Sequence, residues 1–86
     1  MDISEVEKVI GTLNQEMWET NELEYIYLDM SANGYCMVVE FLGHQIWTSE
    51  WDEREYNEKE DKYEPLEGYL RREINKEIEK LKRIKL

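Results

Sequence analysis

Residues 26–41 read IYLDMSANGYCMVVEF, and this stretch decides the fold. The Asn33-Gly34 pair is a strong signal for a two-residue β-hairpin turn, in which both turn positions have positive φ angles. Such a turn predicts antiparallel strands over 24–31 and 35–42. Because side chains alternate along a strand, this register places six apolar residues on one side. They form three cross-strand pairs: Ile26 with Phe41, Leu28 with Val39, and Met30 with Met37.

A third strand and two helices complete the predicted fold. A second turn leads to a strand over 45–51. Apolar residues that recur every three or four positions predict a helix over 4–20 and another over 65–85. Pro65 suits the first turn of the second helix, where its missing N–H has no partner to lose. We therefore expect all 86 residues to form a single α+β domain, ordered α-β-β-β-α, with a three-stranded antiparallel sheet packed with two helices.

The two sides of the predicted sheet differ in chemistry. One side is apolar and can receive both helices. The other side carries four aromatic residues among polar ones: Tyr25, Tyr27, Trp47 and Trp51. Aromatic side chains ringed by polar groups are typical of protein-binding surfaces. Two interpretations follow: either this aromatic face binds a partner or a second copy, or other parts of the chain cover it.

The charge of the chain is strongly negative and unevenly distributed. The net charge is −10, yet residues 65–86 hold seven bases and four acids and are net positive. The rest of the chain therefore repels nucleic acid and anionic membranes and attracts basic protein surfaces. Solubility alone is the competing explanation, since small domains often carry a substantial net charge for that purpose.

An acidic segment over 52–64 is the strongest functional lead. It contains seven carboxylates: Asp52, Glu53, Glu55, Glu58, Glu60, Asp61 and Glu64. The segment has no clean periodicity, so we predict a loop. Alternate side chains of an extended chain lie about 6–7 Å apart on one side, so such a row can imitate a string of phosphates. Tyr56, Tyr63 and Trp51 can stack where bases would. The alternative is a solvated loop without a partner.

The sequence does not predict catalysis, a metal site or a cofactor. Cys36 and His44 are eight positions apart, which is roughly 25 Å along a strand. A nucleophilic pair needs hydrogen-bond reach, and a zinc site needs several Cys or His ligands. The four glycines are scattered and form no phosphate-binding loop. We therefore expect no enzyme activity, no catalytic residue, no bound metal and no cofactor.

The expected location of the chain is the cytoplasm. A single cysteine, Cys36, permits no intrachain disulfide and fits a reducing compartment. The acidic N-terminal residues do not resemble a secretory signal. The longest apolar run, over 35–39, is too short to span a bilayer.

The predicted order of elements resembles the double-stranded-RNA-binding domain family, which reads RNA with a lysine-rich start to its last helix. The corresponding segment here is acidic and reads Glu64-Pro65-Leu66-Glu67. The resemblance covers the order of elements only, and RNA binding in that mode is not expected.

In size and charge the chain resembles phage anti-CRISPR and anti-restriction proteins and immunity proteins against nuclease toxins. We hypothesise an acidic inhibitor that occupies the basic nucleic-acid-binding surface of a partner protein, such as a nuclease, as a nucleic-acid mimic. The partner is a protein, with no direct contact to nucleic acid or to a membrane. The alternative is a homodimeric adaptor or structural module that uses the aromatic sheet face or the long last helix.

Overall fold

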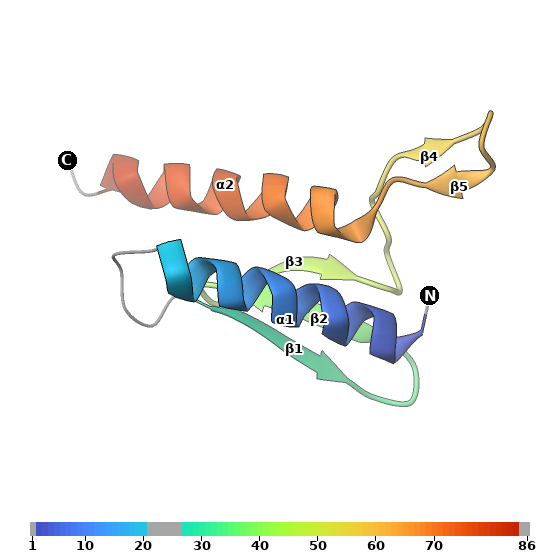
Figure 1. Cartoon of the computed structure of the whole chain (residues 1–86), viewed down its shortest axis with the longest axis horizontal. Helices are drawn as coiled ribbons and strands as arrows, with labels where there is room; N and C mark the ends of the chain where they lie inside the picture. The colour runs from blue at the N-terminus through green and yellow to red at the C-terminus, as the bar shows by residue number, and fades with distance from the viewer. Residues whose placement is uncertain (1, 21–26, 85–86) are drawn as a thin grey trace.

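The computed structural model of the chain describes residues 2–20 and 27–84. It has an α+β fold with two helices and a three-stranded antiparallel sheet, as the sequence predicts, and a second, two-stranded sheet. The elements in chain order are α1 (Ile3–Thr20), β1 (Leu28–Ala32), β2 (Met37–Phe41), β3 (His44–Thr48), β4 (Tyr56–Asn57), β5 (Lys62–Tyr63) and α2 (Leu66–Ile84). In Figure 1, α1 lies across the strands β1, β2 and β3, α2 runs beside it, and β4 and β5 project from the N-terminal end of α2.

The core joins both helices to one side of the three-stranded sheet. Its residues follow the helical and strand periods of the sequence, as the fold requires. The buried hydrophobic residues are Val6, Ile10, Leu13, Leu28, Val39, Phe41, Ile46, Trp47, Leu66, Tyr69, Leu70 and Ile74. α1 begins after Asp2, whose carboxylate accepts a hydrogen bond from the Glu5 N–H at 3.0 Å. No helix in residues 2–20 and 27–84 is both long enough and apolar enough to cross a membrane.

The hairpin between β1 and β2 turns one residue later than predicted. The Asn33 N–H donates to the Cys36 carbonyl at 3.0 Å, so Gly34 and Tyr35 are the turn residues. The Asn33 side-chain oxygen also accepts from the N–H groups of Tyr35 and Cys36, at 2.7 and 2.9 Å. This side-chain acceptor stabilises the later turn. The predicted register was therefore wrong by two residues, and the observed pairs are Leu28 with Phe41, Met30 with Val39, and Ala32 with Met37.

The apolar residues of β1 and β2 face the core as predicted, although their register differs. A register shift of two residues preserves the alternation of side chains, so the apolar residues of β1 and β2 still face the core. Ile26 lies outside the described residues. Two consecutive positive φ angles occur instead in the next turn, where Leu42 and Gly43 have φ values of 53° and 79°. It joins Phe41 directly to His44, the first residue of β3.

A β-bulge in the pairing of β2 with β3 corrects the predicted orientation of Trp47. Glu40 pairs with Gln45, but Val39 pairs with Trp47, so Ile46 is the extra residue. A bulge reverses the alternation beyond it, because two residues of one strand oppose one residue of the other. Ile46 and Trp47 are therefore both buried, at 7% and 4% exposure. The prediction that Trp47 faces away from the core was wrong.

Residues 52–64 form a β-hairpin. The prediction that this segment is a loop was wrong. Tyr56 pairs with Tyr63, and Asn57 pairs with Lys62. Outside these pairs, the Glu64 N–H donates to the Glu55 carbonyl at 2.8 Å. Strands of two residues are too short to show a period in the sequence. We call residues 52–64 the arm, because they project from the rest of the fold (Figure 1).

Candidate functional site

The base of the arm is held by one buried arginine. The Arg54 guanidinium contacts both carboxylate oxygens of Asp52, with its shortest contact at 2.6 Å, and donates to the Glu64 carbonyl at 3.2 Å. Its side chain is only 8% exposed. Arg54 therefore joins the first and last residues of the arm. The Trp47 indole N–H donates to Asp52 at 3.0 Å and connects the arm to the core.

The carboxylates at both ends of the arm already have cationic partners. Burial raises the pKa of Asp52, but hydrogen bonds from Arg54 and Trp47 outweigh burial and bring that pKa below its ordinary value. The Arg72 guanidinium makes two hydrogen bonds to the Glu64 carboxylate, at 2.5 and 3.1 Å, and lowers the pKa of Glu64. Asp52 and Glu64 are thus ionised and neutralised locally, so they position the arm and do not form its accessible charge.

Aromatic rings line one side of the arm. The rings of Tyr56 and Tyr63 meet edge to face, with centroids 5.2 Å apart. The Arg54 guanidinium carbon lies 5.1 Å from the centre of the Tyr63 ring. The Tyr56 hydroxyl donates to the Asp61 carboxylate. Both rings remain about half exposed, so this side offers aromatic surface to a partner.

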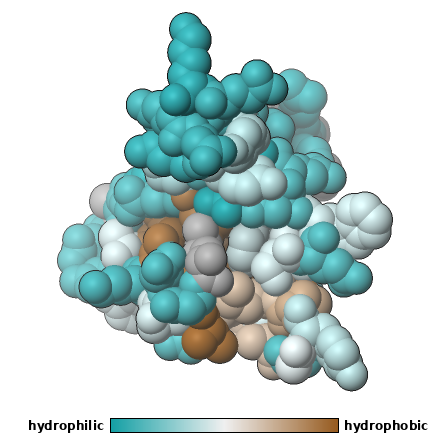
Figure 2. Space-filling model, turned by 90° about the vertical axis from the view of Figure 1, so that its right-hand side faces the viewer, coloured by the Kyte–Doolittle hydropathy of each residue, from teal (hydrophilic) through white to brown (hydrophobic). Residues whose placement is uncertain are grey.

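The remaining carboxylates of the arm lie on its surface. Glu53, Glu55, Glu58 and Asp61 are exposed, and none makes an ion pair with a residue that the structure describes. Glu60 lies 3.8 Å from Lys62, with both side chains mostly exposed. The arm as a whole has seven acids and three bases. Its accessible charge is therefore negative, and the upper, projecting part of the molecule in Figure 2 is hydrophilic.

The arm also has a hollow on its surface. A hollow of about 630 Å³ is bordered by Tyr56, Tyr63 and Pro65, by the acids Glu55, Glu58, Glu60 and Glu64, and by Lys59 and Lys62. It combines apolar ring surface with four carboxylates and two lysines, so its net charge is negative and suits the aliphatic stem and charged end of a lysine or arginine. The structure thus brings most of the predicted acidic residues together with Tyr56 on one element.

The predicted aromatic sheet face is not assembled. Trp47 is buried in the core, and Trp51 lies beyond the end of β3 with 75% exposure. Tyr27 is 59% exposed and borders a hollow with Asp29 and Glu40. Tyr25 lies outside the described residues. Trp51 directly precedes the arm in the sequence.

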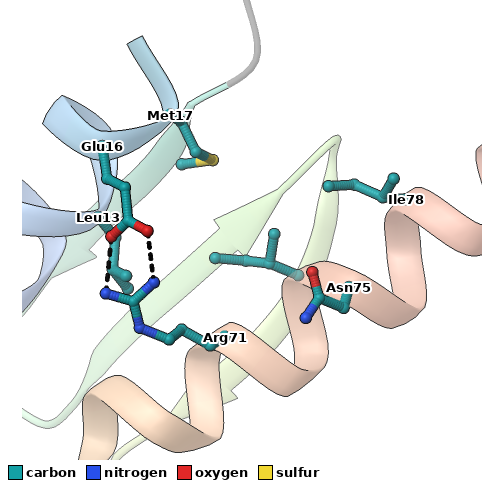
Figure 3. Close-up of a pocket in the computed structure, with 7 residues that line it drawn as sticks. Leu13, Glu16, Met17, Arg71, Asn75 and Ile78 are labelled. Carbon is teal, nitrogen blue, oxygen red and sulfur yellow. Dashed lines mark hydrogen bonds and ion pairs between the residues drawn. The ribbon is translucent and has the colours of Figure 1, made fainter. Parts of the chain in front are cut away.

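A third hollow lies between the helices and was not predicted. Figure 3 shows it between α1 and α2, lined mainly by Leu13, Met17 and Ile78, with a volume of about 270 Å³. Arg71 and Glu16 span it with hydrogen bonds of 2.6 and 2.8 Å, and the bonds from Arg71 lower the pKa of Glu16. The amphipathic stripes of the two helices are the signal that could have indicated it.

The residues considered for catalysis are far apart. His44 pairs with Phe41, and Cys36 lies five residues before Phe41, directly before the start of β2. That separation is about 16 Å, shorter than the distance the sequence implied but well beyond hydrogen-bond reach. Within residues 2–20 and 27–84, no group of three His, Cys, Asp or Glu side chains is placed to hold a metal ion.

No family model, curated protein or solved structure matches the chain.

Proposed function

We propose that this chain is an acidic protein-binding inhibitor and that the arm is its binding surface. In this proposal the arm occupies a basic, nucleic-acid-binding surface of a target protein, as the anti-CRISPR, anti-restriction and nuclease-immunity classes do. The observation that supports it most is the combination of accessible carboxylates and half-exposed tyrosine rings on one projecting hairpin.

The chemistry of the arm fits a nucleic-acid mimic. Glu53, Glu55, Glu58 and Asp61 are exposed carboxylates within nine residues of one hairpin. Closely spaced negative charges of this kind can contact a surface that binds the phosphates of a nucleic acid. The rings of Tyr56 and Tyr63 offer faces that can stack on the guanidinium groups of a nucleic-acid-binding surface.

The arm is preorganised for binding by contacts within the chain. Arg54 and Arg72 hold its two ends, at 2.6 Å from Asp52 and 2.5 Å from Glu64. A surface that is already ordered loses less conformational entropy on association. Accessible charge on such a surface also accelerates encounter with a basic partner and makes that encounter sensitive to salt.

We further propose that the protein acts in the cytoplasm and has no catalytic activity of its own. The alternative, an adaptor that dimerises through its aromatic sheet face, loses support because Trp47 is buried in the core.

Capture from a lysate of the native host tests the proposal. The tagged protein is incubated at about 0.05 M and about 1 M salt, because salt screens accessible charges much more strongly at the higher concentration. We expect a nucleic-acid-binding protein that is held at low salt, shed at high salt, and displaced by added DNA or RNA. A partner that stays bound at high salt and is indifferent to nucleic acid contradicts the mimic.

A further inference from the structure

The exposed side of α2 carries a stripe of cations, of which the proposed function uses only Arg72, as the partner of Glu64. Arg72, Lys76, Lys80 and Arg83 are spaced three or four residues apart, so they lie on one face of the helix. We call these four residues the basic stripe. They border a hollow of about 550 Å³, together with Asn75 and one acid, Glu79.

The cations of the basic stripe are accessible. Lys76 contacts Glu73 at 3.3 Å and Lys80 contacts Glu77 at 3.4 Å, and both lysine side chains are mostly exposed. Ion pairs of this kind, between neighbouring turns of a surface helix, are weak and readily exchanged for stronger partners. The stripe is therefore a cationic surface on a chain whose net charge is −10.

The arm of a second copy has the complementary charge. It carries the exposed carboxylates Glu53, Glu55, Glu58 and Asp61, none of which makes an ion pair with a residue that the structure describes. From Arg72 to Arg83 the stripe extends over about 17 Å of helix.

We infer that the basic stripe of one copy binds the arm of a second copy, and that two such contacts form a symmetric dimer. Arg72 belongs to the stripe and bonds Glu64 at the end of the arm, so the arm and the stripe adjoin on α2. The arm leaves the N-terminal end of α2 (Figure 1), and the stripe extends along α2 as far as Arg83 in its last turn. Antiparallel pairing of two α2 helices brings the arm of each copy next to the C-terminal end of the other copy's helix, where its stripe ends, in a closed two-fold arrangement.

The dimer has a functional consequence that depends on the proposed function. A partner protein and the stripe of a second copy would use the same surface of the arm, so they exclude one another. The dimer is then a resting state from which a basic partner displaces one copy.

Two charge-reversed variants test the dimer. The arm variant is E53K/E55K/E58K, and the stripe variant is K76E/K80E/R83E. All six positions are exposed. Mass is measured by light scattering at about 0.1 M salt, where the Debye length of about 10 Å screens the long-range repulsion between acidic copies but not direct contacts. We expect wild type to have the mass of a dimer and each variant alone to have the mass of a monomer.

Mixing the two variants gives the decisive result. The reversed arm is positive and the reversed stripe is negative, so both contacts become attractive again in the heterodimer and in no homodimer. We expect the equimolar mixture to recover the mass of the dimer and to lose it at about 1 M salt, where the Debye length is about 3 Å. Recovery also shows that both variants are folded.

Three outcomes would overturn the inference. One is a monomeric wild type at about 0.1 M salt. The second is a wild-type dimer that both variants leave intact, because another surface then pairs the copies. The third is a mixture that stays monomeric although circular dichroism shows that both variants are folded. The stripe variant keeps an intact arm, so its capture of a basic host protein separates failure of the dimer from failure of the proposed function.

Discussion

The three-stranded sheet and the arm are both antiparallel β-structures, but different forces hold them. The sheet packs its apolar side against two helices, and Phe41 and Val39 have no exposed surface. The arm pairs only two residues on each strand and depends on Arg54, Arg72 and their carboxylates. Hydrophobic burial therefore stabilises the part of the fold formed by α1, β1, β2, β3 and α2, which we call the body. Hydrogen bonds and ion pairs position the arm, which we propose to be the functional element.

The largest expected effect is on the body. Phe41→Ala should destabilise the fold by about 3–5 kcal/mol, because it leaves a cavity where the ring is fully buried. A small domain has only about 5–15 kcal/mol in total, so the arm should be lost together with the body. Urea unfolding followed by tryptophan fluorescence measures the change. A loss below about 1 kcal/mol would contradict the central role of this ring.

The second-largest effect is expected in the arm and not in the body. Arg54→Met keeps the apolar stem but leaves Asp52 without its guanidinium partner, which should cost about 2–3 kcal/mol. Amide exchange by NMR should show faster exchange at Glu64, whose N–H closes the arm, while amides of β2 stay protected. Arg83→Met is the matched control, since Arg83 is exposed on α2. Equal exchange in the two variants would show that Arg54 does not hold the arm.

Acid should loosen the contact between the arm and the core. The pKa of Asp52 lies below its ordinary value of 3.8, so ionised Asp52 contributes stability above that pH and loses it as the pH falls through the folded pKa. The indole N–H resonance of Trp47, which donates to Asp52, should shift in that acidic range. Asp52→Asn should abolish the shift. A midpoint at or above 3.8 would contradict the proposed stabilisation of the ionised carboxylate.

The smallest effect is expected from Tyr56→Phe. This change removes the hydroxyl that donates to Asp61 on the surface of the arm but keeps the ring against Tyr63. Stability should change by no more than about 0.5 kcal/mol, as for most surface substitutions. Thermal unfolding of the variant and wild type checks this directly. A loss near 2 kcal/mol, about that of a buried charged hydrogen bond, would mean that the hydroxyl organises the arm.

The same contrast explains what the sequence could predict. Helical stripes and strand alternation identified both helices, all three strands of the main sheet and the side that faces the core. The register was wrong by two residues because the Asn33 side chain stabilises a later turn, which no period reveals. Trp47 was assigned to the wrong face because the β-bulge beside it interrupts the alternation of side chains, and no pattern in the sequence marks the bulge.

The arm shows the other limit of sequence reasoning. Its acidic residues were evident, but its two-residue strands were too short to recognise. The bonds from Arg54 to Asp52 and from Arg72 to Glu64 depend on the folded arrangement of the arm and α2. The sequence therefore could not separate the carboxylates that position the arm from those that stay accessible.

One measurement tests most directly whether the arm is the binding surface. The affinity of the captured basic partner is compared for the arm variant E53K/E55K/E58K and a body variant E7K/E19K/D29K, in which each altered residue is exposed and lies outside the arm. Each variant moves the net charge from −10 by six units, to −4, so the two variants have the same net charge and change it in different places. Isothermal titration calorimetry gives both dissociation constants. We predict a loss of about 100-fold or more for the arm variant, which is about 2.7 kcal/mol, and only a few-fold loss for the body variant. Equal losses would mean that net charge alone attracts the partner and would contradict the account.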